Sequence, residues 1–322
     1  MFLIRTLHHP TLRNLLAGIG IALASTGHAN DAIPIRIAYP QALNGQIPLV
    51  LDKSGIAKSH GLDAWYTFFQ NGPPMMEALA AGSVDVVVSS YQPFAVFISR
   101  QPGKATPVAN LGHASYSLLT PKEAKENSLA DLKGKRIALS FGSDSHLDLL
   151  RSIRKFGLDP ASDFKLLHMA PNELNLALNQ GFADAAVIRQ PQARRLEREF
   201  GLRNVQTWPH YFLVIASSEF LARQPTAKER LLDALRETVV YITRNEDRAA
   251  EWFGERLRLS PAIIKELSAQ NPLFKDVKNA DDVHIEFDAA YRQSINDWLA
   301  ASFENGLIKN RVEPLKEQED NQ

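Results

Sequence analysis

Residues 78–88 read ALAAGSVDVVV and residues 177–187 read ALNQGFADAAV, with Gly and Asp at matching positions. Each stretch passes through a glycine into a continuous apolar run, which is typical of a strand covered on both faces of a parallel sheet. Other short motifs recur in the same order and at nearly the same spacing: Arg36-Ile37-Ala38 with Arg136-Ile137-Ala138, Gly61-Leu62-Asp63 with Gly157-Leu158-Asp159, and Gln92-Pro93 with Gln190-Pro191. The ordered repeats predict two lobes of similar build, and a cleft between two such lobes is a favoured ligand site.

Strand and helix patterns alternate around both stretches. Strands are expected at 33–39, 62–69, 84–88, 136–139, 164–169 and 183–188, and helices at 48–58, 72–81, 145–156 and 172–180. From about residue 217, apolar residues recur at helical spacing, which predicts a helical C-terminal part. The fold class is therefore α/β, with two doubly wound α/β lobes joined by a two-strand hinge.

The chain is expected to cross twice between the lobes, near residues 113–117 and 210–214. The predicted boundaries are a signal peptide at 1–29, lobe 1 at 30–114 and 215–322, and lobe 2 at 115–214. Two-strand hinges of this kind absorb the dihedral changes of cleft closure around a ligand.

The N-terminus indicates export. Arg5 and Arg13 precede the apolar run Leu15–Ala24, and small residues follow up to Ala29, which together are typical of a secretory signal peptide. A membrane anchor is the alternative, but the run is too short for a helix to span about 30 Å of hydrocarbon. We therefore expect a periplasmic protein that is soluble after cleavage near Ala29.

The composition excludes several classes of function. Of the 322 residues, Lys plus Arg and Asp plus Glu are both 36, which argues against nucleic acid or an anionic membrane as partner. The absence of cysteine excludes disulfides, thiolate nucleophiles and lipid attachment to cysteine. The histidines form no His-x-x-x-His pair, and neither a P-loop nor a Gly-x-Ser-x-Gly elbow occurs. No metal, cofactor or catalytic residue is expected, and local packing is favoured over catalysis for His146.

The runs 72–85 and 129–138, with Gly142-Ser143-Asp144-Ser145-His146 and residues 183–191, resemble periplasmic binding proteins for aliphatic sulfonates, taurine and nitrate. The resemblance implies a type II periplasmic binding fold and a monomer that delivers a solute to the permease and ATPase of an ABC importer. Proteins of thiamine-pyrimidine metabolism share the fold and are the enzymatic alternative, although the fungal enzyme relies on a cysteine-rich segment that is missing here. A sensor module that presents its ligand to a receptor is a further alternative.

The chain departs from this family at two positions that should face the cleft. Ser89-Ser90-Tyr91-Gln92-Pro93 stands where small residues and an acid are usual, and Arg189 stands where an aromatic residue is common. Arg189 leaves its strand at the carboxyl end, where open α/β sheets bind ligands. Its guanidinium fork matches sulfonate, phosphonate or carboxylate oxygens, so we expect it to bind an acidic group of the ligand. A surface arginine paired with Glu197 or another acid is the alternative.

The helix expected to begin near Ser145 is a second candidate site. Ser143 and Ser145 are expected to cap its free N–H groups, which with the helix dipole would form an anion site. Asp144 in the first turn repels an anion, and an inward-facing carboxylate would instead hold an ammonium group and favour a zwitterion. The remaining predicted ligand-binding residues lie at strand ends and crossings, with bulk solvent as the alternative surroundings of each: Gln41, Asn44, Asn71, Gly72, Ser89, Ser90, Tyr91, Tyr116 and His210. Together they predict a small anionic or zwitterionic organic solute.

Overall fold

The structure is a computed structural model that describes residues 32–316, and the chain from Ala32 onward belongs to one compact unit. The predicted signal peptide lies outside the described residues. Within residues 32–316, no helix is long and apolar enough to cross a membrane.

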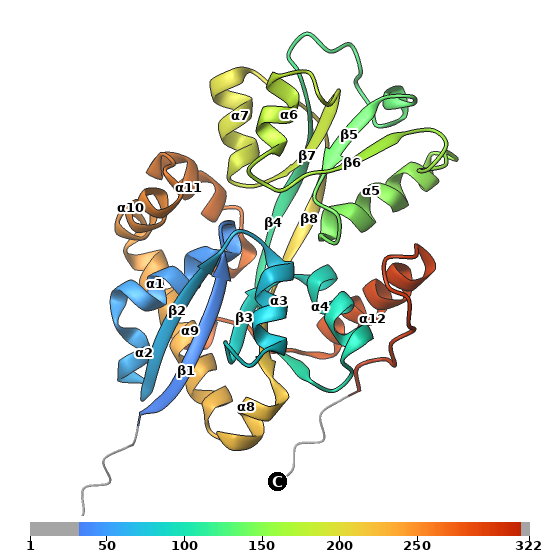
Figure 1. Ribbon diagram of the computed structural model, residues 1–322. Helices are drawn as coiled ribbons and strands as arrows, with labels where there is room; N and C mark the ends of the chain where they lie inside the picture. The colour runs from blue at the N-terminus through green and yellow to red at the C-terminus, as the bar shows by residue number, and fades with distance from the viewer. Residues whose placement is uncertain (1–31, 317–322) are drawn as a thin grey trace, which may run out of the picture. The chain divides into compact units, whose positions relative to one another are not determined.

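The described strands form one eight-stranded sheet in the order β2-β1-β3-β8-β4-β7-β5-β6 (Figure 1). One half contains the parallel strands β1 (Ile33–Pro40), β2 (Leu62–Phe69) and β3 (Val86–Ser89). The other half contains the parallel strands β5 (Arg136–Leu139), β6 (Lys165–His168) and β7 (Ala185–Arg189). The long antiparallel strands β4 (Ala105–Thr120) and β8 (Arg203–Ser217) join the two halves.

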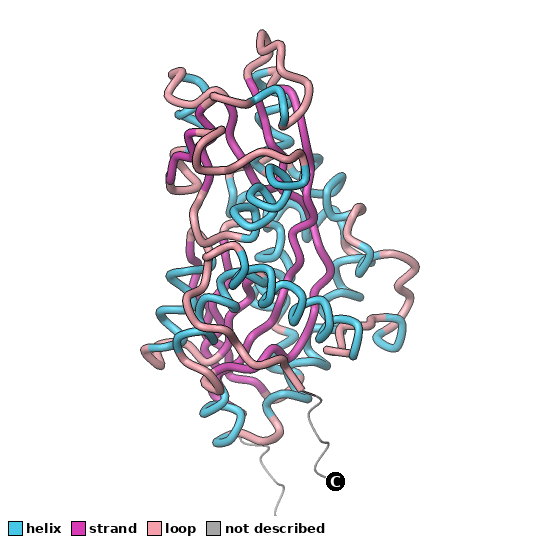
Figure 2. Tube along the Cα trace, turned by 90° about the vertical axis from the view of Figure 1, so that its right-hand side faces the viewer, coloured by secondary structure: helices cyan, strands magenta, loops and turns pink. Residues whose placement is uncertain are grey.

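Helices cover both sides of the sheet, as Figure 2 shows at right angles to the first view. Those of the first half are α1 (Gln46–Ser54), α2 (Ile56–Ser59), α3 (Gly72–Ala80) and α4 (Tyr91–Arg100), and those of the second half are α5 (Asp144–Lys155), α6 (Leu174–Asn179) and α7 (Gln192–Phe200). The C-terminal part adds α8 (Ser218–Arg223), α9 (Ala227–Arg244), α10 (Glu246–Leu257), α11 (Pro261–Ser268) and α12 (Ala289–Glu304). Short 3-10 turns lie at Leu43–Gly45, Ala130–Leu132, Pro272–Phe274 and Ala280–Asp282.

The C-terminal helices complete the first half of the molecule. Leu235, Val239 and Phe253 of α9 and α10 are buried against β1 and α1 in one apolar core. Trp298 and Leu299 of α12 are buried in a second core with α3 and α4. The predicted helical C-terminal part is confirmed, and the chain therefore returns to its first half after β8.

The repeated sequence motifs correspond to a repeated ion pair. Arg36 donates to Asp85 through its backbone N–H at 2.9 Å and through Nη2 at 2.7 Å. Arg136 donates to Asp184 through the same atoms, at 2.8 Å in both contacts. In each half this pair joins the first strand to the residue before the third strand. The α/β fold with two lobes and a two-strand connection, predicted from the repeats, is thus confirmed, while the residue boundaries of the lobes stay a prediction.

Two details differ from the expected elements. The helix expected at 48–58 is interrupted at Gly55, whose φ of 74° is left-handed and favours glycine, so that α1 and α2 are separate. The ladder between β4 and β8 also has a register shift between Asn110 and His113. Gly112 lies in that shift with a φ of 76°, and a Cβ there would lie 1.9 Å from Oδ1 of Asn271.

Candidate functional site

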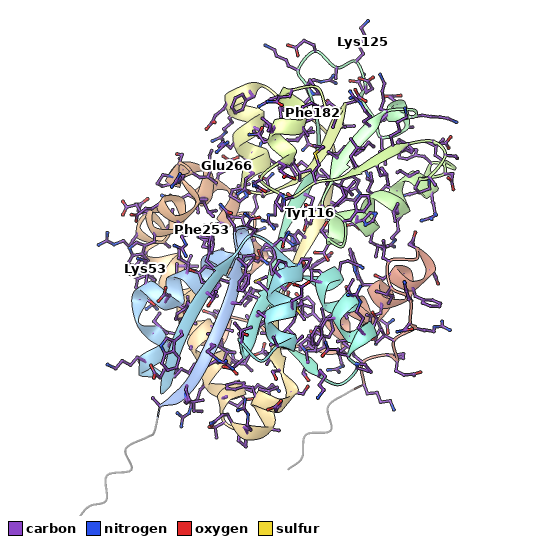
Figure 3. All side chains as sticks on the ribbon, viewed as in Figure 1. Lys53, Tyr116, Lys125, Phe182, Phe253 and Glu266 are labelled. Carbon is purple, nitrogen blue, oxygen red and sulfur yellow. The ribbon has the colours of Figure 1, made fainter. Side chains whose placement is uncertain are left out.

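A cavity of about 40 Å³ lies at the carboxyl ends of strands from both halves of the sheet. Pro40 and Ser89 end β1 and β3, Ser140 follows β5, and Arg189 ends β7. Tyr116 of β4, labelled in Figure 3, lines it where the two halves meet. Because parallel strands of both halves point their carboxyl ends here, the cavity has the position at which open α/β sheets bind ligands.

Most of the residues singled out in the sequence line this cavity: Asn44, Asn71, Gly72, Ser89, Ser90, Tyr116, Ser143, Ser145, Arg189 and His210. The other three, Gln41, Tyr91 and Asp144, do not line it. The structure therefore brings the set together, while the binding role of each member stays a prediction.

Several polar atoms of the first half face the cavity without a protein partner. Asn44 Oδ1, Asn71 Oδ1 and Ser89 Oγ are buried and have no hydrogen-bond partner among the described residues. Asn44 Nδ2 donates to the carbonyl oxygen of Ser89 at 3.3 Å, which fixes the amide. Gly72 lies so close to Ser89 that a Cβ there would be 2.9 Å from the hydroxyl oxygen. Because buried polar atoms are normally hydrogen-bonded, these atoms are candidates for ligand contact.

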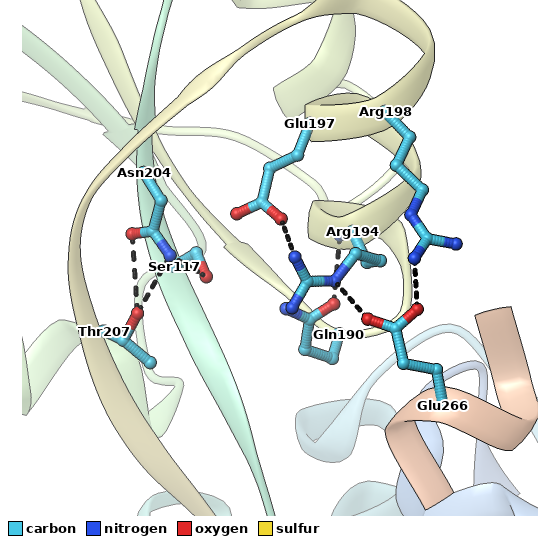
Figure 4. A network of polar contacts seen from close by, with 8 residues as sticks. All are labelled: Ser117, Gln190, Arg194, Glu197, Arg198, Asn204, Thr207 and Glu266. Atoms are coloured by element: carbon cyan, nitrogen blue, oxygen red, sulfur yellow. Dashed lines mark hydrogen bonds and ion pairs between the residues drawn. The ribbon is translucent and has the colours of Figure 1, made fainter. Parts of the chain in front are cut away.

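Arg189 supplies the positive charge of the cavity. It is half-buried at the end of β7, and its Nη2 donates to the carbonyl oxygen of Gln70 in the other half of the molecule. Burial lowers the pKa of its guanidinium, and the nearby Tyr116 opposes that change. Within residues 32–316 no carboxylate lines this cavity. The alternative in which Arg189 pairs with Glu197 is wrong, because Glu197 pairs with Arg194 at 2.9 Å (Figure 4).

Asp144 lies outside the cavity wall, in contact with two residues that line it. Its Oδ1 accepts the backbone N–H of Gln92 at 2.5 Å, and its carboxylate is also hydrogen-bonded by the Ser90 side chain. The other oxygen lies 3.4 Å from Nε2 of His210. Burial raises the pKa of Asp144 to about 7 in spite of these hydrogen bonds. Burial, assisted by Arg189, lowers the pKa of His210 to about 3, so this imidazole is neutral at physiological pH.

The predicted capping of α5 by Ser143 is wrong. Its hydroxyl donates to the carbonyl oxygen of Ser140 at 2.6 Å and lies 2.9 Å from the Ser145 hydroxyl, and it makes no cap bond to the helix. The hydroxyl oxygen could still accept a hydrogen bond while its proton is donated to Ser140, but no N–H group of α5 donates to it. Asp144 places a negative charge in the first turn of α5.

Tyr91 and Gln41 have different surroundings from those predicted. Tyr91 begins α4 and is buried, with its ring stacked on Tyr211 at 5.2 Å between ring centroids. Gln41 lines a separate compartment of about 170 Å³, which also includes Arg189. Both residues lie just after a strand, as predicted. Their position in the chain does not determine whether the side chain points toward the cavity.

The sequence reasoning missed Phe141, Pro171 and Leu174, which line the cavity from the second half. Phe141 stacks on His146 at 4.3 Å, and its backbone N–H donates to Nδ1 of His168 at 3.0 Å. Local packing of His146, which was favoured over catalysis, agrees with this arrangement. Phe141 follows the strand expected at 136–139, so its position after a strand is the sequence signal for it. Only polar residues after strands were predicted to bind the ligand.

A polar network connects the two halves beside the cavity (Figure 4). Glu266 of α11 pairs with Nε of Arg194 at 3.3 Å and with Arg198, both on α7. Arg194 also receives a local contact from Glu197, so that two arginines and two carboxylates form one charged cluster. The network therefore ties the C-terminal helices to the second half of the sheet.

Comparisons with known proteins agree with this geometry. Residues 56–251 match the model of a family described as ABC transporter, phosphonate, periplasmic substrate-binding protein. A putative binding protein of Brucella abortus is 27% identical over 88% of this chain and 89% of its own length. A putative aliphatic sulfonates-binding protein of Escherichia coli is 30% identical, over 66% of this chain and 67% of its own. The alkanesulfonate-binding protein of Xanthomonas axonopodis pv. citri, solved with MOPS bound, superposes with a TM-score of 0.74 at 20% identity and covers 87% of this chain and 95% of that chain.

Proposed function

Because this chain belongs to the family of periplasmic substrate-binding proteins of ABC transporters, we propose that it captures a small anionic or zwitterionic organic solute in the cavity between its lobes. The loaded protein then presents the solute to a permease and ATPase complex in the inner membrane. The N-terminal segment would direct export to the periplasm, where the protein acts as a monomer.

One observation carries the proposal. Arg189 places a guanidinium in a cavity that no carboxylate within residues 32–316 lines. Burial of this cation is unfavourable, as the lowered pKa shows, and an anionic ligand would offset that cost with charge-assisted hydrogen bonds. A sulfonate, phosphonate or carboxylate group fits the planar donor fork.

The side of the cavity opposite Arg189 suggests what the rest of the ligand contains. The free amide oxygens of Asn44 and Asn71 accept hydrogen bonds, so they suit an ammonium or hydroxyl group of the solute. The names of the relatives, which include aliphatic sulfonate and taurine binders, support a sulfonate-like acidic group. Capture favours closure only if the solute binds the closed form more tightly than the open form, and residues from both halves line the cavity.

The test is calorimetric titration of the purified protein with taurine, ethanesulfonate, ethylphosphonate and propionate. We expect at least one to bind, and Arg189→Ala to lower its affinity by about 2–5 kcal/mol, because the contact is a charge-paired one. Arg223→Ala serves as the matched control, since Arg223 lies on α8 with a side chain that is 61% exposed. An Arg189→Ala protein that binds the same solute as tightly as the wild type would remove this residue from the site.

The enzymatic alternative predicts a different outcome in the same preparation. Ligand released by denaturing the purified complex and identified by mass spectrometry should be unchanged if the protein is a carrier. Steady conversion of that ligand to a product would favour an enzyme instead.

A further inference from the structure

The cavity at Arg189 is too small for a whole organic solute. Its volume of about 40 Å³ provides room for a few water-sized groups, since a single water needs roughly 10–15 Å³ of such space. The rest of a solute must therefore extend into adjoining space. Two compartments adjoin the cavity, and each shares lining residues with it.

The first compartment, of about 260 Å³, is largely apolar. It lies between α3 and α4 and shares Pro73, Pro93 and Phe141 with the cavity, but not Arg189. The Phe141 ring is fixed by its stack on His146, so an apolar ring stands where the two spaces adjoin. Because Arg189 does not line this compartment, we do not assign it to the part of the solute next to the guanidinium.

The second compartment, of about 170 Å³, includes Arg189 itself and has a mixed lining, with apolar residues such as Leu257 and Leu259 beside the polar ones. Carboxamides from both halves of the molecule line it: Gln41, Gln70, Asn172, Asn175 and Gln192. Within residues 32–316 it has no carboxylate in its lining, and its second cation is Arg195. Gln192 Oε1 is buried and has no hydrogen-bond partner among the described residues.

We propose that this carboxamide compartment binds a neutral, hydrogen-bonding group of the solute, such as a pair of hydroxyls, next to the acidic group at Arg189. Carboxamides both donate and accept, which matches hydroxyl or amide groups and neither attracts nor repels charge. Gln41 comes from the first half and Gln192 from the second, so a group held by both also favours closure. The inference rests on the proposed function, because it needs an anion at Arg189.

The test compares matched probes that differ only in hydroxyl groups. These are propane-1-sulfonate against 2,3-dihydroxypropane-1-sulfonate, with the corresponding propylphosphonate and butyrate pairs, titrated into the full protein. We expect the diol to bind at least about fivefold more tightly, since two net hydrogen bonds together give roughly 5- to 150-fold. Gln192→Leu and Gln41→Leu should each reduce this ratio to near one. Gln192→Leu, at a residue that does not line the cavity at Arg189, should also leave the affinity for the plain anion within twofold.

Gln101→Leu is the matched control, because Gln101 lines the apolar compartment on the opposite side. It should leave the ratio unchanged. A ratio near one in the wild type, with Arg189-dependent binding of the plain anions, overturns this inference and leaves the proposed function intact. A ratio that responds to Gln101→Leu and not to Gln192→Leu overturns it as well. Absence of Arg189-dependent binding by every probe overturns both proposals.

Discussion

The carboxylate of Asp144 on α5 accepts the backbone N–H of Gln92 on α4 at 2.5 Å, and this contact joins the two halves of the molecule beneath the cavity. The two helices begin close to each other, and one side chain places its negative charge at both of their N-termini. The arrangement stabilises both helix ends, but it buries a carboxylate. Its second oxygen has no hydrogen-bond partner within residues 32–316 and lies 3.4 Å from Nε2 of His210.

Asp144→Asn should change how stability depends on pH. The pKa of Asp144 is raised from 3.8 to about 7 in the folded protein, so the folded state holds a proton that the unfolded state has released. Its contribution is fully present below pH 4 and is lost as pH rises through 7, with a slope of at most about 1.4 kcal/mol per pH unit. Wild type should therefore lose stability relative to Asp144→Asn between pH 5 and pH 8, as measured by urea unfolding.

Several titratable groups face Asp144 and must be compared in the same experiment. Asp148 on α5 has a pKa raised to about 8, first by burial and then by Asp144, while Tyr116 and His210 face Asp144 from the strands. At each pH, the free energy of unfolding of Asp144→Asn is subtracted from that of the wild type, which removes most of the contribution of these other groups. Asp63→Asn, on the exposed face of β2, is the control. If the difference in the free energy of unfolding is constant from pH 5 to pH 8, the raised pKa of Asp144 is contradicted.

The repeated Arg–Asp pairs should differ in strength. Asp85 and Asp184 receive matching hydrogen bonds from Arg36 and Arg136, but the side chain of Asp85 is 7% exposed and that of Asp184 is 33% exposed. Asp85→Ala should cost about 2–3 kcal/mol in the free energy of unfolding, because it leaves a guanidinium and a backbone N–H without their acceptor. Asp184→Ala should cost less, since water reaches that site. If urea unfolding shows the same loss of stability for both variants, the strength of these pairs does not depend on burial.

Gln92 should be more important for stability than for binding. Its Oε1 accepts Trp298 Nε1 at 2.8 Å and Ser302 Oγ at 2.7 Å, which fastens α12 to α4 in the interior. Gln92→Leu should destabilise by about 2–4 kcal/mol, because two buried donors lose their acceptor. Adding Ser302→Ala should restore part of the loss. If the double variant is simply the sum of the singles, the shared acceptor is not the cause.

Glu266→Gln should favour the open form of the cleft. Glu266 pairs with Arg194 and Arg198 across the two halves, and exposed pairs of this kind contribute roughly 0.2–1 kcal/mol each. Ligand affinity should fall by about two- to fivefold at low salt, and the effect should shrink at 0.5 M NaCl as screening increases. Glu219→Gln, in a pair within α8, is the control. A loss of affinity that is independent of salt would argue against an electrostatic connection.

The sequence predicted the fold well and the site only in outline, for one physical reason. Ala78–Val88 and Ala177–Val187 each carry a glycine, an acid and an apolar run whose structure is decided by local interactions and strand pairing. Both halves could therefore be recognised from the chain alone. The direction in which Asp144 or Gln41 points depends on the element packed against it from the other half. Asp144 turns toward Gln92 because α4 begins there, and no local pattern records that neighbour. Arg189 could be placed, since strand order alone fixes the end at which it leaves the sheet.

The two long strands β4 and β8 have a mechanical consequence. A ladder shared by both lobes prevents them from sliding apart, so relative motion is confined to twisting and bending of a ribbon two strands wide. The pairing of the two strands is irregular where the register shifts between Asn110 and His113, and Gly112 lies in that shift, packed against Asn271. We therefore expect closure around a solute to twist the ribbon at this irregularity rather than along its regularly paired length.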